Sequence, residues 1–206
     1  LDMNLKSYII YNLQDSYKKR GKLKFFTGFK GLKILNIARL TEQKDHLTLI
    51  KSLKILKEKN VNFRCCIIGK GPCRERLIKE ILNLNLKSVV KLIGYKNKAE
   101  QFIHQSNIFV LSSRFEGLPN VLIEAQKYNI PVISSNCPTG PNEILLNGKL
   151  GDLFPVKNYS ILSHRLYNFS KNSKPLKNKS KKAKKYLKRF NPIINSKKYF
   201  ELLFAK

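Results

Sequence analysis

The sequence predicts an α/β fold: a Rossmann-like, doubly wound parallel sheet with helices on both faces and further helices at the carboxyl end. Two observations favour this fold. Short apolar runs alternate with amphipathic segments of helical period across residues 33–134, and such alternation is typical of parallel sheets. Each apolar run is followed by a glycine, a serine or a polar turn, which is where a strand is expected to end.

Five apolar runs are the expected strands, and they cover Lys33–Ala38, Phe63–Ile68, Val89–Ile93, Ile108–Leu111 and Pro131–Ser134. The helices expected between them cover Lys44–Glu58, Arg74–Leu84, Ala99–His104 and Pro119–Tyr128. In the first of these helices apolar residues recur every third position, as one buried face requires. Three more helices are expected in the tail, at Ser160–Ser170, Lys179–Phe190 and Ile194–Phe204.

Length and composition suit one folded domain with a short extension. The chain has 206 residues, 42% of them hydrophobic, which is enough to bury a core and excludes wholesale disorder. We expect three parts: a linker over residues 1–31 that starts with a strand remnant at Tyr8–Tyr11, a Rossmann-like domain over 32–158, and a basic helical tail over 159–206. No apolar run approaches the roughly 20 residues that a membrane-spanning helix needs.

The net charge is strongly positive, with 41 Lys and Arg against 13 Asp and Glu. Lysine outnumbers arginine by 33 to 8, whereas nucleic-acid readers favour arginine, so nucleic-acid binding is the minority interpretation. Residues 171–189 hold ten basic side chains in nineteen. Such a segment would be attracted to an anionic membrane surface by about 1 kcal/mol per side chain. A solvated helix face is an equally good interpretation.

The cysteines fit neither a metal site nor a disulfide framework. Cys65 and Cys66 are adjacent in an expected strand, so they point to opposite faces and cannot hold one ion together. Cys73 and Cys137 stand apart from them. No metal is therefore expected, and unpaired thiols fit a reducing, cytoplasmic compartment.

Ligands of doubly wound sheets bind beyond the carboxyl ends of the strands, so the loops there hold the candidate residues. Arg39 ends the first expected strand and Lys44 begins the next helix. Two cations beside a helix start suit a diphosphate, although a solvated helix start is the simpler alternative. Gly69 after the second strand, and Gly94 with Tyr95 after the third, permit a close ligand or merely turn the chain.

The loop after the fourth strand carries two carboxylates, Glu116 and Glu124, eight positions apart. Glu116 lies in the loop, and Glu124 lies in the helix that Pro119 is suited to start. Free backbone N–H groups near Asn120 and Val121 would then face the same crevice as Glu116. Glu124 is also explained without a ligand, as a carboxylate favoured by the helix dipole.

Two other features are weaker. A Gly- and Pro-bearing turn at residues 137–144 leads into a further helix, and Glu143 in it could cap that helix or contact a ligand. His46, His104 and His164 show no triad-like pairing with a serine or cysteine and are expected to be core or surface residues.

Four motifs, in their order along the chain, resemble those of family 4 glycosyltransferases over residues 32–156. They are Ala-Arg-Leu with a following Lys (38–44), Gly-x-Gly-Pro (69–72), Glu-Gly-Leu-Pro-Asn (116–120) within an E-x7-E pair, and Gly-Pro-Asn-Glu-Ile (140–144). The resemblance implies the carboxyl-terminal, donor-binding half of a two-domain GT-B fold that acts with retention and without a bound metal. Asn129 and Ala38 stand where the family usually has glycine, and neither change removes a charged contact.

The resemblance also implies roles for single residues. Arg39 and Lys44 would hold the diphosphate of the donor, and Glu116 would face its sugar. Glu124 would accept hydrogen bonds from the ribose, and the backbone of Gly117, Leu118, Pro119, Asn120 and Val121 would meet sugar and phosphates. Gly69, Gly94 and Tyr95 fall where the base usually lies.

The family's acceptor domain would precede residue 1, so we expect a fragment, a truncated product or one subunit of a split enzyme. The function expected is sugar transfer from a nucleotide-diphosphate sugar, UDP-linked by preference, to a glycan or lipid-linked acceptor in cell-surface polysaccharide or glycoconjugate synthesis. The expected place is the cytoplasm or the inner face of the membrane. One alternative is a non-catalytic nucleotide-sugar-binding subunit that needs an acceptor-domain chain. The other is a basic membrane-surface or nucleic-acid-binding module.

Overall fold

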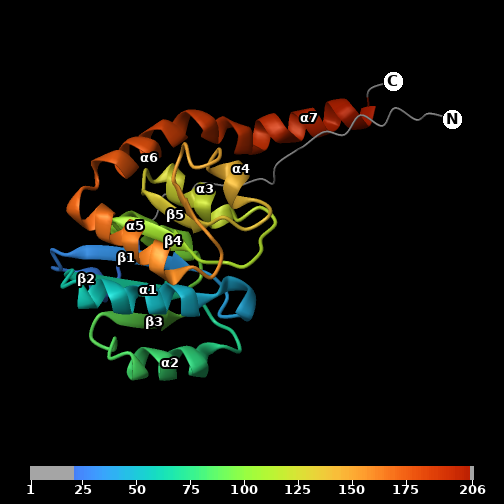
Figure 1. Ribbon diagram of the computed structural model, residues 1–206. Coiled ribbons are helices and arrows are strands. Elements are labelled where there is room, and N and C mark those ends of the chain that lie inside the picture. Colours follow the sequence, from blue (N-terminus) through green and yellow to red (C-terminus); the bar gives the residue numbers. More distant parts are fainter. Residues whose placement is uncertain (1–20, 205–206) are drawn as a thin grey trace.

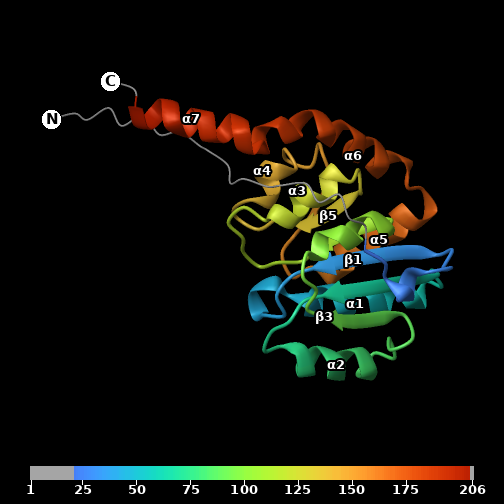
Figure 2. The ribbon, with the colours of Figure 1, turned by 180° about the vertical axis from the view of Figure 1, so that it is seen from behind.

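The computed structural model describes residues 21–204 and contains one parallel sheet between two layers of helices (Figures 1 and 2). Its strands are β1 Leu32–Ile37, β2 Phe63–Ile68, β3 Val90–Gly94, β4 Ile108–Leu111, β5 Val132–Ser135 and β6 Asp152–Phe154. Their order is β3-β2-β1-β4-β5-β6, and every neighbouring pair is parallel. This is the predicted Rossmann-like, doubly wound arrangement. The strand expected at residues 8–11 lies outside the described residues.

The α-helices are α1 His46–Glu58, α2 Arg74–Asn83, α3 Asn120–Lys127, α4 Pro141–Ile144, α5 Tyr159–Lys171, α6 Lys174–Tyr186 and α7 Pro192–Phe204. Four short 3₁₀ helices complete the fold: η1 Lys24–Phe26, η2 Glu42–Lys44, η3 Ala99–Gln105 and η4 Leu187–Phe190. In the part of the chain that the structure describes, no helix combines the length and apolarity that crossing a bilayer requires.

Successive strand residues feed two separate hydrophobic cores, one on each face of the sheet. Ile34 and Cys65 belong to the core under α1, α2 and α5, whereas Leu35 and Cys66 belong to the core under η3, α3 and α4. This alternation follows from the two-residue period of a strand. It confirms that the adjacent cysteines point to opposite faces.

Three elements differ from the sequence prediction. The strand β6 was not expected, because only Leu153 and Phe154 are apolar in this three-residue segment. Helix α6 begins at Lys174 rather than Lys179 because Pro175 fits its first turn. Helix α1 begins at His46 rather than Lys44, since Asp45 takes left-handed backbone angles with φ of 44° and separates η2 from α1.

The sheet order sets the position of the functional site. The chain runs outward from β1 to β3 and then crosses back to β4 on the other side of β1. The connections after β1 and β4 therefore lead to helices on opposite faces of the sheet, α1 and α3, and the point between these two strands is the switch point where ligands of open α/β sheets bind.

Candidate functional site

The loops that follow β1 and β4 lie against each other at the carboxyl edge of the sheet. The Arg114 N–H donates to the Gln43 carbonyl at 2.7 Å, and the Gln43 side-chain amide donates to the Phe115 carbonyl at 2.9 Å. The Ser112 hydroxyl donates to the Lys44 carbonyl at 3.0 Å. These bonds fix the η2 turn, and with it Lys44, beside the loop that carries Glu116.

An ion pair between Lys44 and Glu116 forms the centre of this contact. The Lys44 Nζ lies 2.6 Å from the Glu116 Oε1, and the two side chains are 15% and 5% exposed. The Ser113 hydroxyl donates to the same carboxylate oxygen at 2.6 Å. Because an ammonium group has three N–H donors, Lys44 keeps donors for a second anion while it holds Glu116.

A glycine and a threonine hold the backbone of the Glu116 loop from the other side. The Thr139 hydroxyl donates to the Glu116 carbonyl. Gly140 has φ of 84°, and a Cβ built on it would lie 1.9 Å from the Gly117 carbonyl oxygen. Only glycine allows this combination of left-handed backbone and close approach.

Arg39, the other predicted cation, lies on the same loop as Lys44. Its side chain is exposed, and one guanidinium nitrogen lies 3.4 Å from the Gln43 Oε1. Gln43 thus links Arg39 to the β4 loop. The sequence suggested that these two cations lie at one helix start. The structure differs, because Asp45 separates Lys44 from α1.

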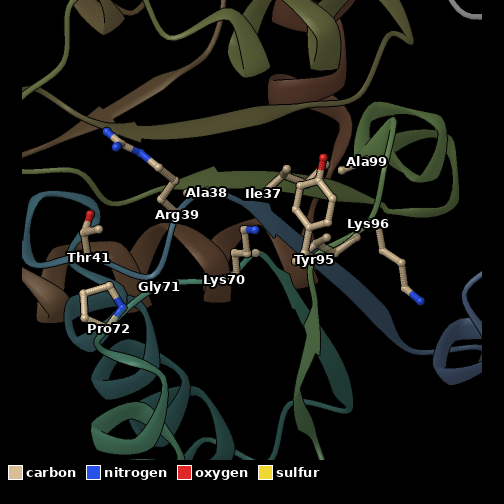
Figure 3. A pocket seen from close by; sticks show the side chains of 12 residues that line it. Ile37, Ala38, Arg39, Thr41, Lys70, Gly71, Pro72, Tyr95, Lys96 and Ala99 are labelled. Carbon is tan, nitrogen blue, oxygen red and sulfur yellow. The ribbon is translucent and has the colours of Figure 1, made fainter.

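A cavity of about 630 Å³ opens beside Arg39, at the carboxyl ends of β1, β2 and β3. It is lined by Ile37, Ala38, Arg39, Thr41, Ile68, Gly69, Lys70, Gly71, Pro72, Tyr95, Lys96 and Ala99. Figure 3 shows Arg39 and Tyr95 on two sides of it. The Lys70 Nζ lies 5.1 Å from the centre of the Tyr95 ring. A Cβ at Gly69 would lie 1.9 Å from the Ala38 carbonyl oxygen, so this glycine lets two strand ends meet.

The remaining predicted residues lie around the start of α3. Gly117 is exposed, and a Cβ built on it meets nothing within 4 Å. Pro119 precedes the first helical residue, Asn120. The side chains of Leu118 and Val121 pack against the core, which leaves their backbone as the part available to a ligand. Glu124 is half-buried on α3.

The structure therefore divides the predicted site residues into two groups. Arg39, Gly69 and Tyr95 line the cavity, and Gly94 directly precedes Tyr95 with φ of 81°. Lys44 and Glu116 form the ion pair, and the residues from Gly117 to Glu124 continue from that pair into α3. No carboxylate belongs to the cavity lining.

Sequence reasoning missed the supporting roles of the polar side chains of Gln43, Ser113 and Thr139, and it identified Gly140 only as part of a turn and a motif. Side chains that bond across 72 or 23 positions of the chain leave no local pattern. Only Gly140 had a visible signal, because it precedes Pro141 at a turn.

The histidine next to Lys44 is a core residue, as expected. His46 Nε2 lies 3.1 Å from the Asn36 Oδ1, and the Asn36 amide donates to the Val110 carbonyl at 2.9 Å. Burial lowers the pKa of His46 to about 4, and the nearby charge of Lys44 adds to this effect. A neutral histidine thus ties the start of α1 to β1 and β4.

Across the described residues, no group of three or more His, Cys, Asp or Glu side chains could hold a metal ion. The four cysteines are free, and burial raises the pKa of Cys66 to about 12. Positive charge at this edge of the sheet comes from Arg39 and Lys44, and from Lys70 and Lys96 in the cavity lining.

Known proteins share both sequence and fold with this chain. Residues 19–186 match the family described as glycosyl transferases group 1. An uncharacterized glycosyltransferase of Methanocaldococcus jannaschii is 48% identical over 111 residues, which are 54% of this chain and 27% of that protein. An Escherichia coli protein named as the putative colanic acid biosynthesis glycosyltransferase WcaL is 35% identical over 147 residues, which are 68% of this chain and 36% of that protein.

A third relative covers most of the chain. It is the Campylobacter jejuni N-acetylgalactosamine-N,N'-diacetylbacillosaminyl-diphospho-undecaprenol 4-alpha-N-acetylgalactosaminyltransferase, 29% identical over 188 residues, which are 91% of this chain and 51% of that enzyme. The chain thus spans about half or less of the length of these three relatives.

Two solved structures have the same fold. Anabaena HepE in complex with UDP superposes with a TM-score of 0.83 at 18% identity, over 97% of this chain and 57% of that one. Staphylococcus aureus TarM, in a complex with UDP and other ligands, gives 0.82 at 20% identity over 98% of this chain and 40% of that one. The chain has the fold of one half of a GT-B glycosyltransferase, and it belongs to the family of group 1 glycosyl transferases.

Proposed function

We propose that this chain is the donor-binding half of a retaining glycosyltransferase, which takes a sugar from a UDP-linked donor and passes it to a glycan or lipid-linked acceptor. One observation carries the proposal. One loop carries two cations: Arg39, which lines a cavity of about 630 Å³, and Lys44, which binds the buried carboxylate of Glu116.

The cations suit the diphosphate of the donor. The guanidinium of Arg39 can fork two phosphate oxygens, and Lys44 offers its remaining N–H donors from a fixed position beside Glu116. As the bond between sugar and phosphate breaks, negative charge grows on the leaving diphosphate. Positive groups fixed in advance stabilise that charge at little reorganisation cost.

Glu116 is suited to the sugar. Its carboxylate is held by Lys44 and Ser113, and its backbone is held by Thr139. It lies directly before the open backbone at Gly117. We assign the backbone from Gly117 to Val121 to the sugar and phosphates, because the start of α3 leaves N–H groups without helical partners.

The cavity is suited to the nucleoside. Its volume lies within the range of about 300–1,000 Å³ that is usual for small-ligand pockets. Gly69, Gly94 and Tyr95 are assigned to the base, and the exposed ring of Tyr95 offers a stacking surface. Glu124 is assigned to the ribose hydroxyls. The choice of UDP is supported by the neighbours solved in complex with UDP.

The test is calorimetric titration of the chain with UDP, GDP and ADP at moderate salt, which limits non-specific attraction to a basic protein. Arg39→Ala and Glu124→Gln should each weaken UDP binding at least about tenfold, the effect of losing one charge-assisted hydrogen bond. Arg74→Ala and Glu75→Gln on α2 are matched controls, since both residues are exposed and lie outside the cavity lining. Equal UDP affinity in all four variants would refute the assignment.

A second candidate is a nucleotide-sugar-binding subunit that completes its active site with another chain. A transfer assay separates the two candidates. Sugar transfer by the purified chain alone would exclude the subunit interpretation, whereas UDP binding without transfer would support it.

A further inference from the structure

Helix α6 has one buried side and one side made of lysines. Leu176, Ser180 and Ala183 face the protein interior. The exposed lysines of the helix, which we call the α6 lysine face, are Lys174, Lys177, Lys181, Lys182, Lys184 and Lys185. Figures 1 and 2 show α6 on the opposite side of the molecule from α2.

No carboxylate among residues 21–204 neutralises the α6 lysine face. Residues 153–200 contain no Asp or Glu. The nearest acid along the chain, Asp152, is bound by Lys179 at 2.7 Å and lies 3.7 Å from Arg165. Within residues 21–204 no ion pair involves the six lysines of the face. Like charges three and four positions apart repel and destabilise a helix.

The high lysine content of the chain does not by itself produce such a face. Helix α2 is also basic, but Glu75 and Glu80 are interleaved with its three cations. In α1, Lys54 pairs with Glu58 at 3.2 Å. Helix α6 therefore differs from α1 and α2, because its six exposed lysines have no carboxylate partner among the described residues.

Two adjoining hollows lie along the α6 lysine face. One of about 460 Å³ includes Lys30, Lys171 and Lys177, and one of about 410 Å³ includes Lys177, Lys181 and Lys184. Both also contain Asn107, and neither contains a carboxylate. Ammonium and amide groups are donors for phosphate oxygens, so the hollows suit phosphate-bearing groups that enter from outside.

We propose that the α6 lysine face docks on the anionic headgroups of a lipid bilayer. A lysine is a compact point charge that suits a diffuse anionic surface, whereas base and single-phosphate readers favour the arginine fork. The face itself contains no arginine. No residue of α6 lines the cavity of about 630 Å³ at the carboxyl edge of the sheet, so a ligand bound there would not occupy the α6 lysine face. This proposal does not depend on the proposed function.

The expected effect follows from the charge count. Each lysine near an anionic surface changes the partition coefficient by about fivefold, less as salt rises. Removing three lysines should weaken binding by roughly 100-fold at low salt and about tenfold near physiological salt. Binding should also weaken steeply as salt is raised.

The test compares two triple variants of the full chain by sedimentation with vesicles. The first, Lys177→Gln, Lys181→Gln and Lys184→Gln, keeps good helix formers on α6. The matched control, Lys24→Gln, Lys79→Gln and Lys87→Gln, removes the same charge from exposed positions elsewhere. The vesicles are pure phosphatidylcholine or contain roughly one third phosphatidylglycerol. Circular dichroism checks that both variants keep their helices.

The proposal predicts that the wild type and the control bind the phosphatidylglycerol vesicles, that the α6 variant loses most of this binding, and that none of them binds pure phosphatidylcholine. Equal binding by the two variants would overturn the proposal, because the net charge alone would then explain the attraction. It would also be overturned if duplex DNA bound through α6 while vesicles did not. The third contrary result is release from vesicles by inorganic phosphate at constant ionic strength, which would indicate a site for the free anion.

Discussion

Replacement of Lys44 by methionine is the sharpest test of the ion pair at the centre of the site. Methionine keeps most of the apolar stem and removes the ammonium group that lies 2.6 Å from the Glu116 carboxylate. Glu116 then remains with the Ser113 hydroxyl as its hydrogen-bond donor and with a side chain only 5% exposed. Leaving a buried carboxylate short of its cation should destabilise the fold by about 2–4 kcal/mol.

The double variant Lys44→Met, Glu116→Gln distinguishes a lost attraction from a stranded charge. A neutral amide accepts the Ser113 hydrogen bond and carries no charge that needs solvation. The double variant should therefore recover most of the loss and lie within about 1 kcal/mol of the wild type. The coupling energy between the two positions should be about 2 kcal/mol, well above the value of exposed pairs.

Urea unfolding followed by circular dichroism measures both effects. With a slope of about 2–3 kcal/mol per molar urea, the single variant should unfold about 1 M earlier than the wild type. Lys79→Met, at an exposed position on α2, controls for the loss of a lysine as such. The reasoning is refuted if Lys44→Met unfolds together with the wild type, or if the double variant is as unstable as the single one.

Three other substitutions test separate features of the site. Gly140→Ala should cost at least about 2 kcal/mol more in urea unfolding than Gly148→Ala, because both glycines have φ of 84° but only a Cβ at Gly140 meets a backbone oxygen at 1.9 Å; equal losses would mean that the contact is unimportant. The depressed pKa of His46, about 4, means that the unfolded chain binds the extra proton first, so stability present above pH 6.5 is lost as the pH falls toward 4. Between pH 7 and about pH 4.5 the wild type should lose about 2 kcal/mol more than His46→Gln, and parallel pH profiles would contradict this. Tyr95→Ala should leave stability within about 0.5 kcal/mol, since the ring is 63% exposed, but should weaken UDP binding about tenfold; Tyr186→Ala is the control, and no change in affinity would remove Tyr95 from the site.

The alternation of apolar and amphipathic segments was sufficient to predict the fold up to β5. Strands such as Phe63–Ile68 have four buried residues in succession, and a buried parallel strand leaves that signal in any sequence. The edge strand β6 leaves none, because it has three residues and its first is Asp152. The pairing of β6 with β5 depends on tertiary contacts instead.

The charged residues of the site were found from the sequence because they follow predicted strands directly. Their partners were not found. Gln43 and Thr139 act through bonds to residues on other loops, and Ser113, which bonds to Glu116 three positions along the same loop, is one of two adjacent serines that the sequence does not distinguish. The start of α1 was misplaced for a related reason. Asp45 takes left-handed backbone angles between the short helix η2 and α1, and the spacing of apolar residues alone could not indicate this break.

The bonds that hold Glu116 indicate whether the site of this chain is ordered before a ligand binds. The carboxylate is fixed by Lys44 and Ser113, the backbone by Thr139, and the loop by the close approach at Gly140. All four contacts lie within this chain, and none needs a donor to form. A site that is already ordered loses little conformational entropy when the ligand binds. The affinity for UDP should therefore be set mainly by contacts that this chain supplies. A chain that folds but does not bind UDP would contradict this expectation.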